Sequence, residues 1–185
     1  FAFRFTVLDN PDNVNAFALP GGHIFIYSGL IRAADSEAEL ASVLAHEVAH
    51  VTAGHPSDLL AAQVGLGTLQ QLALGRNPGM LAQLGSAIAS QGYLSAYTRD
   101  QEQEADKRGL QFLSQAGYEP SAMARFFQEL ANMRNTQPGL VSAFFSTHPA
   151  PGQRAERVAS LIQSRGYGPG RQAILGGFEQ IQARI

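Results

Sequence analysis

The 185-residue sequence contains no cysteine, so disulfides and cysteine-bound zinc are excluded, and any metal must bind histidine and carboxylate side chains. Charged residues make up only 15% of the chain, and a formal net charge of −2 provides no basic surface for nucleic acid. The longest weakly polar run, residues 59–74, is too short for a membrane span and is interrupted by glutamine and threonine. A hydrophobic content of 45% instead predicts one globular domain over residues 1–185.

Residues 46–50 have the pattern H-E-x-x-H within the strongest helical pattern of the chain, which is expected to begin near Ser36. His46 and His50 are one turn apart, so both rings point to the same side of the helix and can bind one metal ion. Glu47 lies about 100° round the helix from His46, where it can act on a metal-bound water without binding the metal. The alternative is an amphipathic helix with two incidental histidines.

A catalytic zinc site needs a third protein ligand and keeps one position open. A metzincin peptidase would have a histidine six residues after His50, and that position is Pro56. His55 comes one residue too early and would lie on the far side of a continuing helix. The metzincin pattern is therefore excluded, and acidic residues become the candidates for the third ligand.

A helix is expected at about residues 99–116, and one of its stripes holds two acidic and two small residues: Glu102, Ala105, Asp106 and Gly109. The small residues would let this helix lie close against the H-E-x-x-H helix. Glu102 could then bind the metal, and Asp106 could accept a hydrogen bond from the other ring nitrogen of His46. The alternative is a solvated charged helix with both acids unpaired.

Together, these motifs resemble the gluzincin zinc peptidases of the BepA, HtpX and CAAX-prenyl-endopeptidase type. Residues 15–22, residues 97–99 and the pair His148-Pro149 followed by Arg154 extend the resemblance to about residues 1–160. It implies an α+β, zincin-like (minigluzincin) fold with one Zn²⁺ per chain. HtpX-type and CAAX-type members span the membrane, so the chain resembles more closely the soluble, periplasmic BepA-like branch. The helical repeats that follow the BepA-type peptidase unit are not expected here.

Further site residues follow from the resemblance. His148 could donate a hydrogen bond to the developing oxyanion, or it could be a fourth zinc ligand that keeps the enzyme latent. A purely structural histidine before Pro149 is the alternative. An extended peptide substrate is expected to add as a strand beside a segment that comprises Asn15, Ala16, Phe17 and Ala18.

Other polar residues are given structural roles. Tyr97 is interpreted as packing, with a role in shaping the site as the alternative. His55 is interpreted as a helix-end residue, and Glu104 as the natural partner of Arg108 on the face opposite Glu102.

The remaining pattern predicts a small antiparallel sheet beside a mainly helical body. Strands are expected at residues 1–7 and 23–27, the H-E-x-x-H helix is expected to end at Gly54 and Pro56, and the tail after residue 166 is ambiguous. Further helices are expected in four regions: two helices within 58–97 parted by residues 75–79, then one each at about 99–116, 121–133 and 152–164.

We therefore expect a zinc-dependent endopeptidase that acts on proteins or peptides in envelope quality control. The alternatives are a largely latent, zinc-bound module that binds unfolded envelope proteins, and a structural helical domain without metal. The expected location is the periplasm or cell envelope, with a targeting segment already removed because the chain begins at Phe1 and not at methionine. Residues 58–97 leave room for peripheral membrane contact, including contact with outer-membrane assembly.

Overall fold

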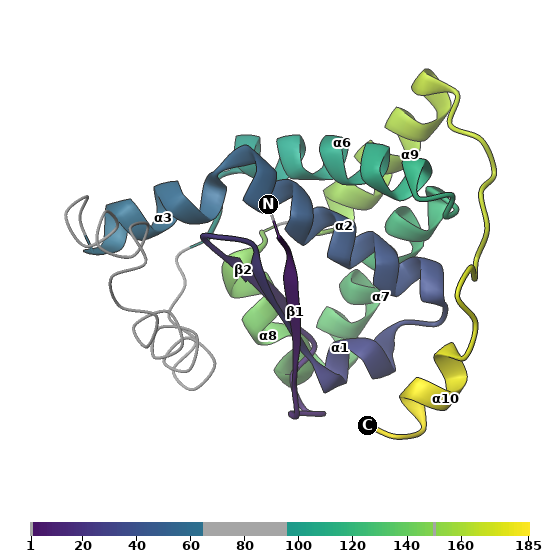
Figure 1. The fold of residues 1–185 in the computed structure, drawn as a ribbon, viewed down its shortest axis with the longest axis horizontal. Helices are drawn as coiled ribbons and strands as arrows, with labels where there is room; N and C mark the ends of the chain where they lie inside the picture. The colour runs from purple at the N-terminus through teal and green to yellow at the C-terminus, as the bar shows by residue number, and fades with distance from the viewer. Residues whose placement is uncertain (1, 65–95, 150) are drawn as a thin grey trace.

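The computed structural model describes residues 2–64, 96–149 and 151–185, in which a small sheet lies beside a larger helical body (Figure 1). This arrangement confirms the coarse prediction of a mixed fold dominated by helices. The expected break at residues 75–79, the helix after it and most of the helix before it lie outside the described residues, as does most of the region considered for membrane contact. Within the described ranges, no helix is long and apolar enough to cross a membrane.

The sheet has three strands, β1 (Arg4–Leu8), β2 (Ala16–Leu19) and β3 (His23–Tyr27), in the order β1-β3-β2. β3 pairs antiparallel with β2 but parallel with β1, so the prediction of an antiparallel sheet was wrong for the β1–β3 pair. The reason is that β2, which was not predicted as a strand, intervenes in the chain and takes the other edge of β3. Its four residues are all buried, and such an apolar run shows no alternation for the sequence to reveal.

The H-E-x-x-H helix, α2 (Glu37–Ala53), begins and ends as predicted. The Ser36 side chain accepts a hydrogen bond from the Glu39 backbone N–H, and Gly54 ends the helix in the left-handed conformation at φ 83°. A new helix, α3 (His55–Val64), starts at the next residue. Pro56 therefore lies in the first turn of α3, where its missing N–H costs no hydrogen bond.

The helical body continues with α6 (Arg99–Gln115), α7 (Ser121–Thr136), α8 (Pro138–Thr147) and α9 (Pro151–Arg165). Three of these match predicted helices. α8 was not predicted, because its opening Pro138-Gly139 reads as a turn in sequence although proline is well suited to the first turn of a helix. The short helix α1 (Ser28–Ala33), which follows β3 directly, was missed for the similar reason that Ser28-Gly29 reads as a strand exit.

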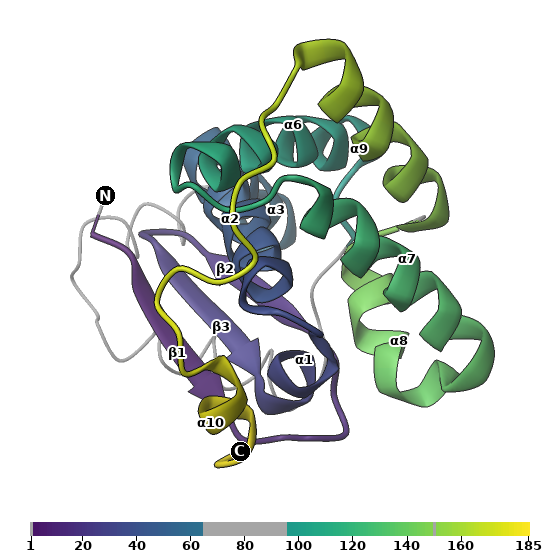
Figure 2. The ribbon, with the colours of Figure 1, turned by 90° about the vertical axis from the view of Figure 1, so that its right-hand side faces the viewer.

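α6 lies along α2 in both ribbon views, and the small residues of α6 make this close packing possible (Figures 1 and 2). Ala105 is fully buried, and a β-carbon added at Gly109 would lie only 3.2 Å from the backbone nitrogen and α-carbon of His46. The core continues from this contact into α7, whose Phe126 and Leu130 are fully buried. The metal-site candidates on α2 and α6 are therefore brought together by a tightly packed helix pair.

The tail returns from α9 past the start of α2 to the region of α1, beside which it ends in α10 (Phe178–Gln182) (Figure 1). Glu37 accepts hydrogen bonds from the backbone N–H groups of residues 174–176, and the Ala38 N–H donates to the Gln172 carbonyl. The Gln182 side chain donates to the carbonyl oxygens of Ile31 and Ala34. Because polar contacts hold this segment in place, its sequence shows no hydrophobic periodicity. This explains why the structure of the tail could not be predicted from the sequence.

Candidate metal centre

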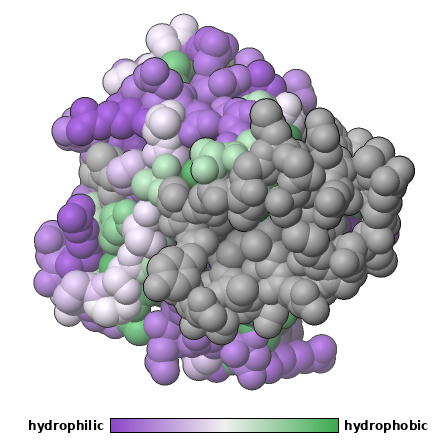
Figure 3. All heavy atoms as spheres, turned by 90° about the vertical axis from the view of Figure 1, so that its left-hand side faces the viewer, coloured by the Kyte–Doolittle hydropathy of each residue, from purple (hydrophilic) through white to green (hydrophobic). Residues whose placement is uncertain are grey.

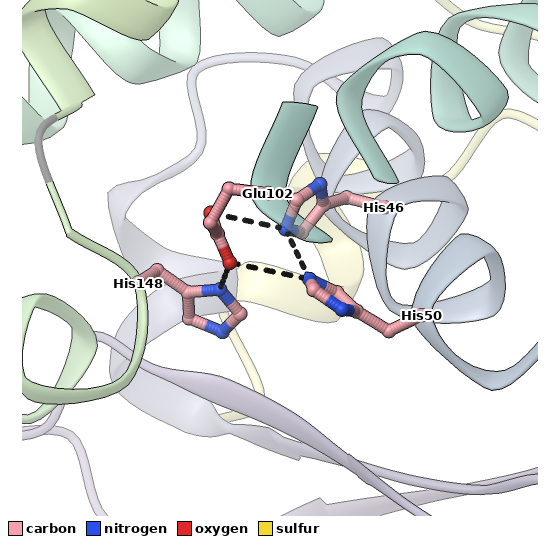
Figure 4. A group of neighbouring side chains, drawn as sticks. All are labelled: His46, His50, Glu102 and His148. Carbon is pink, nitrogen blue, oxygen red and sulfur yellow. Dashed lines mark hydrogen bonds and ion pairs between the residues drawn. The ribbon is translucent and has the colours of Figure 1, made fainter. Parts of the chain in front are cut away.

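His46 and His50 lie on the side of α2 that faces α6, and both are almost fully buried. Their Nε2 atoms are 3.0 Å apart, so the two lone-pair positions converge as the one-turn spacing predicts. Figure 4 shows both rings pointing toward the same carboxylate.

That carboxylate belongs to Glu102, in the first turn of α6. Its Oε1 lies 3.3 Å from His50 Nε2, and its Oε2 lies 3.7 Å from His46 Nε2. A capping box between Thr98 and Gln101 fixes the start of α6 and therefore the direction of Glu102. The structure thus brings together the three residues that the sequence selected as metal ligands.

His148 approaches the same point from the end of α8, on the opposite side of Glu102 from α2 (Figure 4). Its Nδ1 lies 2.8 Å from Glu102 Oε1, and its Nε2 lies 3.5 Å from Glu47 Oε1. One potential ligand atom from each of four buried residues lies within 4.8 Å of the others: His46, His50, Glu102 and His148.

The residues at this point fit a metal ion. Three imidazoles and one carboxylate form a donor set that zinc and similar ions favour. Among the described residues, both carboxylate oxygens of Glu47, the Tyr97 hydroxyl and His148 Nε2 are buried without a hydrogen bond. Leaving several buried polar atoms unpaired is costly, so the arrangement is that of a site built for an ion and an oxygen-bearing ligand.

The electrostatics of the cluster favour the metal-binding protonation states of His50 and Glu102. Burial, together with the neighbouring His46 ring, holds the pKa of His50 well below its usual range, which keeps the His50 ring neutral. Burial raises the pKa of Glu47. The pKa of Glu102 is lowered in spite of burial, because His148 and Arg154 stabilise its negative charge. Burial alone would lower the pKa of His148, but the carboxylates of Glu102 and Glu47 raise it.

A second layer of charged residues surrounds the ligands. Asp106 is fully buried, and its Oδ1 lies 3.2 Å from His46 Nδ1. The Arg154 guanidinium donates to both oxygens of Asp106, from Nε at 3.0 Å and from NH2 at 2.6 Å, and it also pairs with Glu102. Its carbon Cζ lies 4.1 Å from the centre of the Phe127 ring. Arg154, which the sequence marked only through a resemblance, links two acidic residues of α6, Glu102 and Asp106.

Two residues given structural roles also touch the cluster. The Tyr97 ring stacks on His50, with centroids 3.8 Å apart and planes 19° apart, so the packing interpretation describes the ring but not the buried hydroxyl. His55 Nδ1 lies 2.9 Å from His50 Nδ1, so the expectation that His55 faces away from His50 was wrong. The expectation assumed that α2 continues past Ala53, whereas the left-handed turn at Gly54 reverses the chain before His55.

The segment expected to bind substrate forms the β2 edge of the sheet and contacts α2 and α3. Its residues, at 0–6% exposure, are all buried: Asn15, Ala16, Phe17 and Ala18. The Tyr27 N–H donates to the Asn15 carbonyl, which fixes the phase of the antiparallel ladder. Because hydrogen-bonded and non-hydrogen-bonded pairs alternate, the backbone polar groups of Ala16 and Ala18 point away from β3, toward the edge of β2 at which the described residues form no further strand.

An H-E-x-x-H helix with a buried glutamate on the neighbouring helix defines a metallopeptidase centre. The chain belongs to peptidase family M48, whose sequence profile matches residues 2–162. It is 37% identical over 161 residues to the beta-barrel assembly-enhancing protease of Yersinia pestis. The aligned region covers 82% of this chain and 33% of that protein.

Two other relatives have different names. The mitochondrial metalloendopeptidase OMA1 of Schizosaccharomyces pombe is 35% identical, covering 80% of this chain and 43% of its own length. The metalloprotease LoiP of Escherichia coli is 34% identical, covering 83% of this chain and 61% of its own length. The chain thus spans about a third of the beta-barrel assembly-enhancing proteases it matches. Family membership and these names confirm the predicted class, a metalloendopeptidase that uses a metal ion.

Proposed function

We propose that residues 1–185 form a single zincin-like domain that hydrolyses peptide bonds in proteins, with zinc as the metal and Glu47 as the general base. The observation that carries the proposal is the fully buried Glu47 carboxylate beside the cluster of His46, His50 and Glu102, which accepts no hydrogen bond from any described residue. An incidental pair of histidines gives no reason for a carboxylate to be buried without a hydrogen bond.

His46, His50 and Glu102 would hold one Zn²⁺. Bound there, zinc would polarise the scissile carbonyl and lower the pKa of a water from about 15.7 toward about 7. Asp106, 3.2 Å from His46 Nδ1, would keep the His46 proton on that nitrogen and leave Nε2 free for the metal.

Glu47 would take the proton of the attacking water and pass it to the leaving amine. The burial that raises the pKa of Glu47 makes it a better base for this transfer than an exposed glutamate. His148 Nε2, 3.5 Å from the Glu47 carboxylate, is close enough to the reacting atoms to donate a hydrogen bond to the developing oxyanion.

Replacing the general base tests the mechanism directly. Glu47→Gln should retain zinc, because Glu47 is not among the ligands, while casein hydrolysis should fall by about 100-fold or more because proton transfer is lost. Zinc content by elemental analysis and casein cleavage are measured on the same preparation. A zinc-loaded Glu47→Gln protein with wild-type activity would rule out this role.

A second candidate is a largely latent, zinc-bound module that binds unfolded envelope proteins. It is favoured by the position of His148 within the four-residue donor cluster, since four protein ligands give a closed zinc site and three leave a position open. In this state His148 would occupy the position that water needs.

His148→Ala separates the two roles of that histidine. If His148 donates to the oxyanion, we expect hydrolysis to fall by about 100-fold, the usual effect of losing such a donor. If His148 closes the site, hydrolysis should rise and wild-type activity should be low. Unchanged activity would contradict both roles and leave His148 structural.

The outward-facing backbone of Ala16 and Ala18 suits a substrate that binds as an added strand next to β2. A cleaved peptide should therefore lose reactivity when the backbone nitrogens that face β2 are methylated, whereas methylation of the intervening nitrogens should be tolerated. Equal sensitivity at all positions would contradict strand addition.

We further propose a role in envelope protein quality control, with the periplasm or cell envelope as location and outer-membrane assembly as a contact. Support comes from the relatives that are named for enhancing beta-barrel assembly.

A further inference from the structure

The second metal-ligand candidate on α2 has a polar partner outside the cluster. His50 directs Nε2 toward Glu102, while its Nδ1 lies 2.9 Å from the Nδ1 atom of His55. His55 is 4% exposed, so water cannot readily replace this contact. We propose that His55 is a positioning residue that fixes the tautomer and ring orientation of His50, an inference that rests on the proposed zinc site.

The local fold explains how His55 reaches this position. Gly54 adopts φ 83°, which ends α2 and turns the chain so that the first residue of α3 folds back beside His50. Tyr97 stacks on the face of the His50 ring. The ring is therefore held in its plane by Tyr97 and at its outer nitrogen by His55, and only Nε2 remains directed inward.

The hydrogen positions follow from the donor and acceptor count. Two facing ring nitrogens can share only one proton, so one of them must accept. If His50 offers its Nε2 lone pair to a metal, its own proton is on Nδ1 and is donated to His55. His55 then has its proton on Nε2, which lies 3.5 Å from Glu104 Oε2. With a metal on His50 Nε2, the contacts therefore select a single set of tautomers along His50, His55 and Glu104.

The two α2 histidines differ in what stabilises them. His46 faces the fully buried carboxylate of Asp106, whereas the chain of contacts from His50 leads to the surface. The side chain of Glu104 is 44% exposed, and its other oxygen pairs with Arg108 at 2.6 Å. The predicted Glu104–Arg108 pair is thus present, and Glu104 also orients His55.

Two substitutions of His55 test whether its Nδ1 atom is needed as the acceptor for the His50 Nδ1 proton. His55→Leu removes the acceptor and keeps an apolar side chain of moderate size, so zinc affinity should fall by about 10- to 100-fold. His55→Asn places an amide oxygen near the position of Nδ1 and should recover most of that affinity. His23→Leu, a histidine substitution on β3, is the matched control and should bind zinc like the wild type.

Glu104 is tested in the same assay. Glu104→Ala should weaken zinc binding less than His55→Leu, since His55 remains in place but loses its outer acceptor. Glu156→Ala removes an equal charge from an exposed position on α9 and should have no effect. Equal affinities of the Glu104→Ala and Glu156→Ala proteins would remove Glu104 from the proposal.

Zinc affinity is measured by competition with a chromophoric chelator, and circular dichroism verifies that each variant is folded. NMR of the zinc-loaded protein should show the His50 Nδ1 proton downfield and slow to exchange in the wild type and in His55→Asn, but upfield and exchanging faster in His55→Leu, where it has no acceptor. The proposal is overturned if a folded His55→Leu protein binds zinc as tightly as the wild type, or if its His50 Nδ1 proton is unchanged. Failure of the wild type itself to bind zinc would instead refute the proposed function.

Discussion

Arg154 shows at the scale of a single residue how the site tolerates several buried charges. Its side chain is 2% exposed and forms ion pairs with Glu102 and Asp106, two acids on one face of α6. A planar guanidinium can bond to both carboxylates at once, whereas a lysine ammonium offers a single point charge. Arg154 therefore lets the metal-ligand candidate Glu102 stay ionised before any metal binds.

We expect Arg154→Met to lower the free energy of unfolding of the metal-free protein by about 3–5 kcal/mol, because two buried carboxylates lose their counterion. Urea denaturation in the presence of a chelator measures the change. Arg157→Met, on the same helix but only half-buried, should change stability by no more than about 0.5 kcal/mol. Similar losses for both variants would show that the Arg154 ion pairs contribute little.

At the scale of secondary structure, the end of α2 controls which residues surround His50. The left-handed turn at Gly54 places His55 beside His50, whereas one more turn of α2 would carry residue 55 to the other side of the helix. Pro56 stabilises the new helix that starts there, because its fixed backbone angle suits a first turn.

Gly54→Ala should reduce stability by about 1–2 kcal/mol, since a side chain makes the left-handed conformation unfavourable. Apart from the adjacent residues, no described part of the chain lies within 4 Å of the added carbon, so the cost comes from the backbone and not from a clash. Gly139→Ala, in α8 and equally free of neighbours, should instead be neutral or stabilising by up to about 1 kcal/mol. Thermal denaturation of the two variants compares them; equal effects would contradict this explanation.

At the scale of the whole molecule, the four donors come from three parts of the chain: α2, the start of α6 and the end of α8. Packing of α6 against α2 aligns the first three, and α8 brings the fourth across the cluster (Figures 1 and 4). A metal ion bound here would link segments that are separated by about a hundred residues, so binding and folding should be strongly coupled.

Zinc should therefore stabilise the folded protein. At a free zinc concentration about 1,000 times the dissociation constant, the gain is about 4 kcal/mol, and a chelator should reverse it. Scanning calorimetry with zinc and with chelator measures the shift, and Glu102→Gln should show a much smaller one. A zinc-dependent shift of the same size in Glu102→Gln would exclude Glu102 as a ligand.

Local features were predictable from the sequence. The Ser36 and Gly54 signals bounded α2, and the stripe of Glu102, Asp106 and small residues marked the face of α6 that packs against it. β2 and α8 were not predictable, because a fully buried apolar run lacks alternation and a Pro-Gly pair suits either a turn or a helix start. The parallel β1–β3 pairing was missed as well, because it depends on the position of β2, which was not predicted as a strand.

The sequence by itself determined the family, through the resemblance of its combined motifs. It also determined the H-E-x-x-H helix and the acids that could complete a metal site, because helical periodicity fixes which side chains share a face. Only the tertiary structure decided that His55 supports His50, that Arg154 joins Glu102 to Asp106, and that His148 lies within the donor cluster. These contacts depend on a chain reversal at Gly54 and on packing between distant segments. Such distances are set by the whole fold, and no local pattern encodes them.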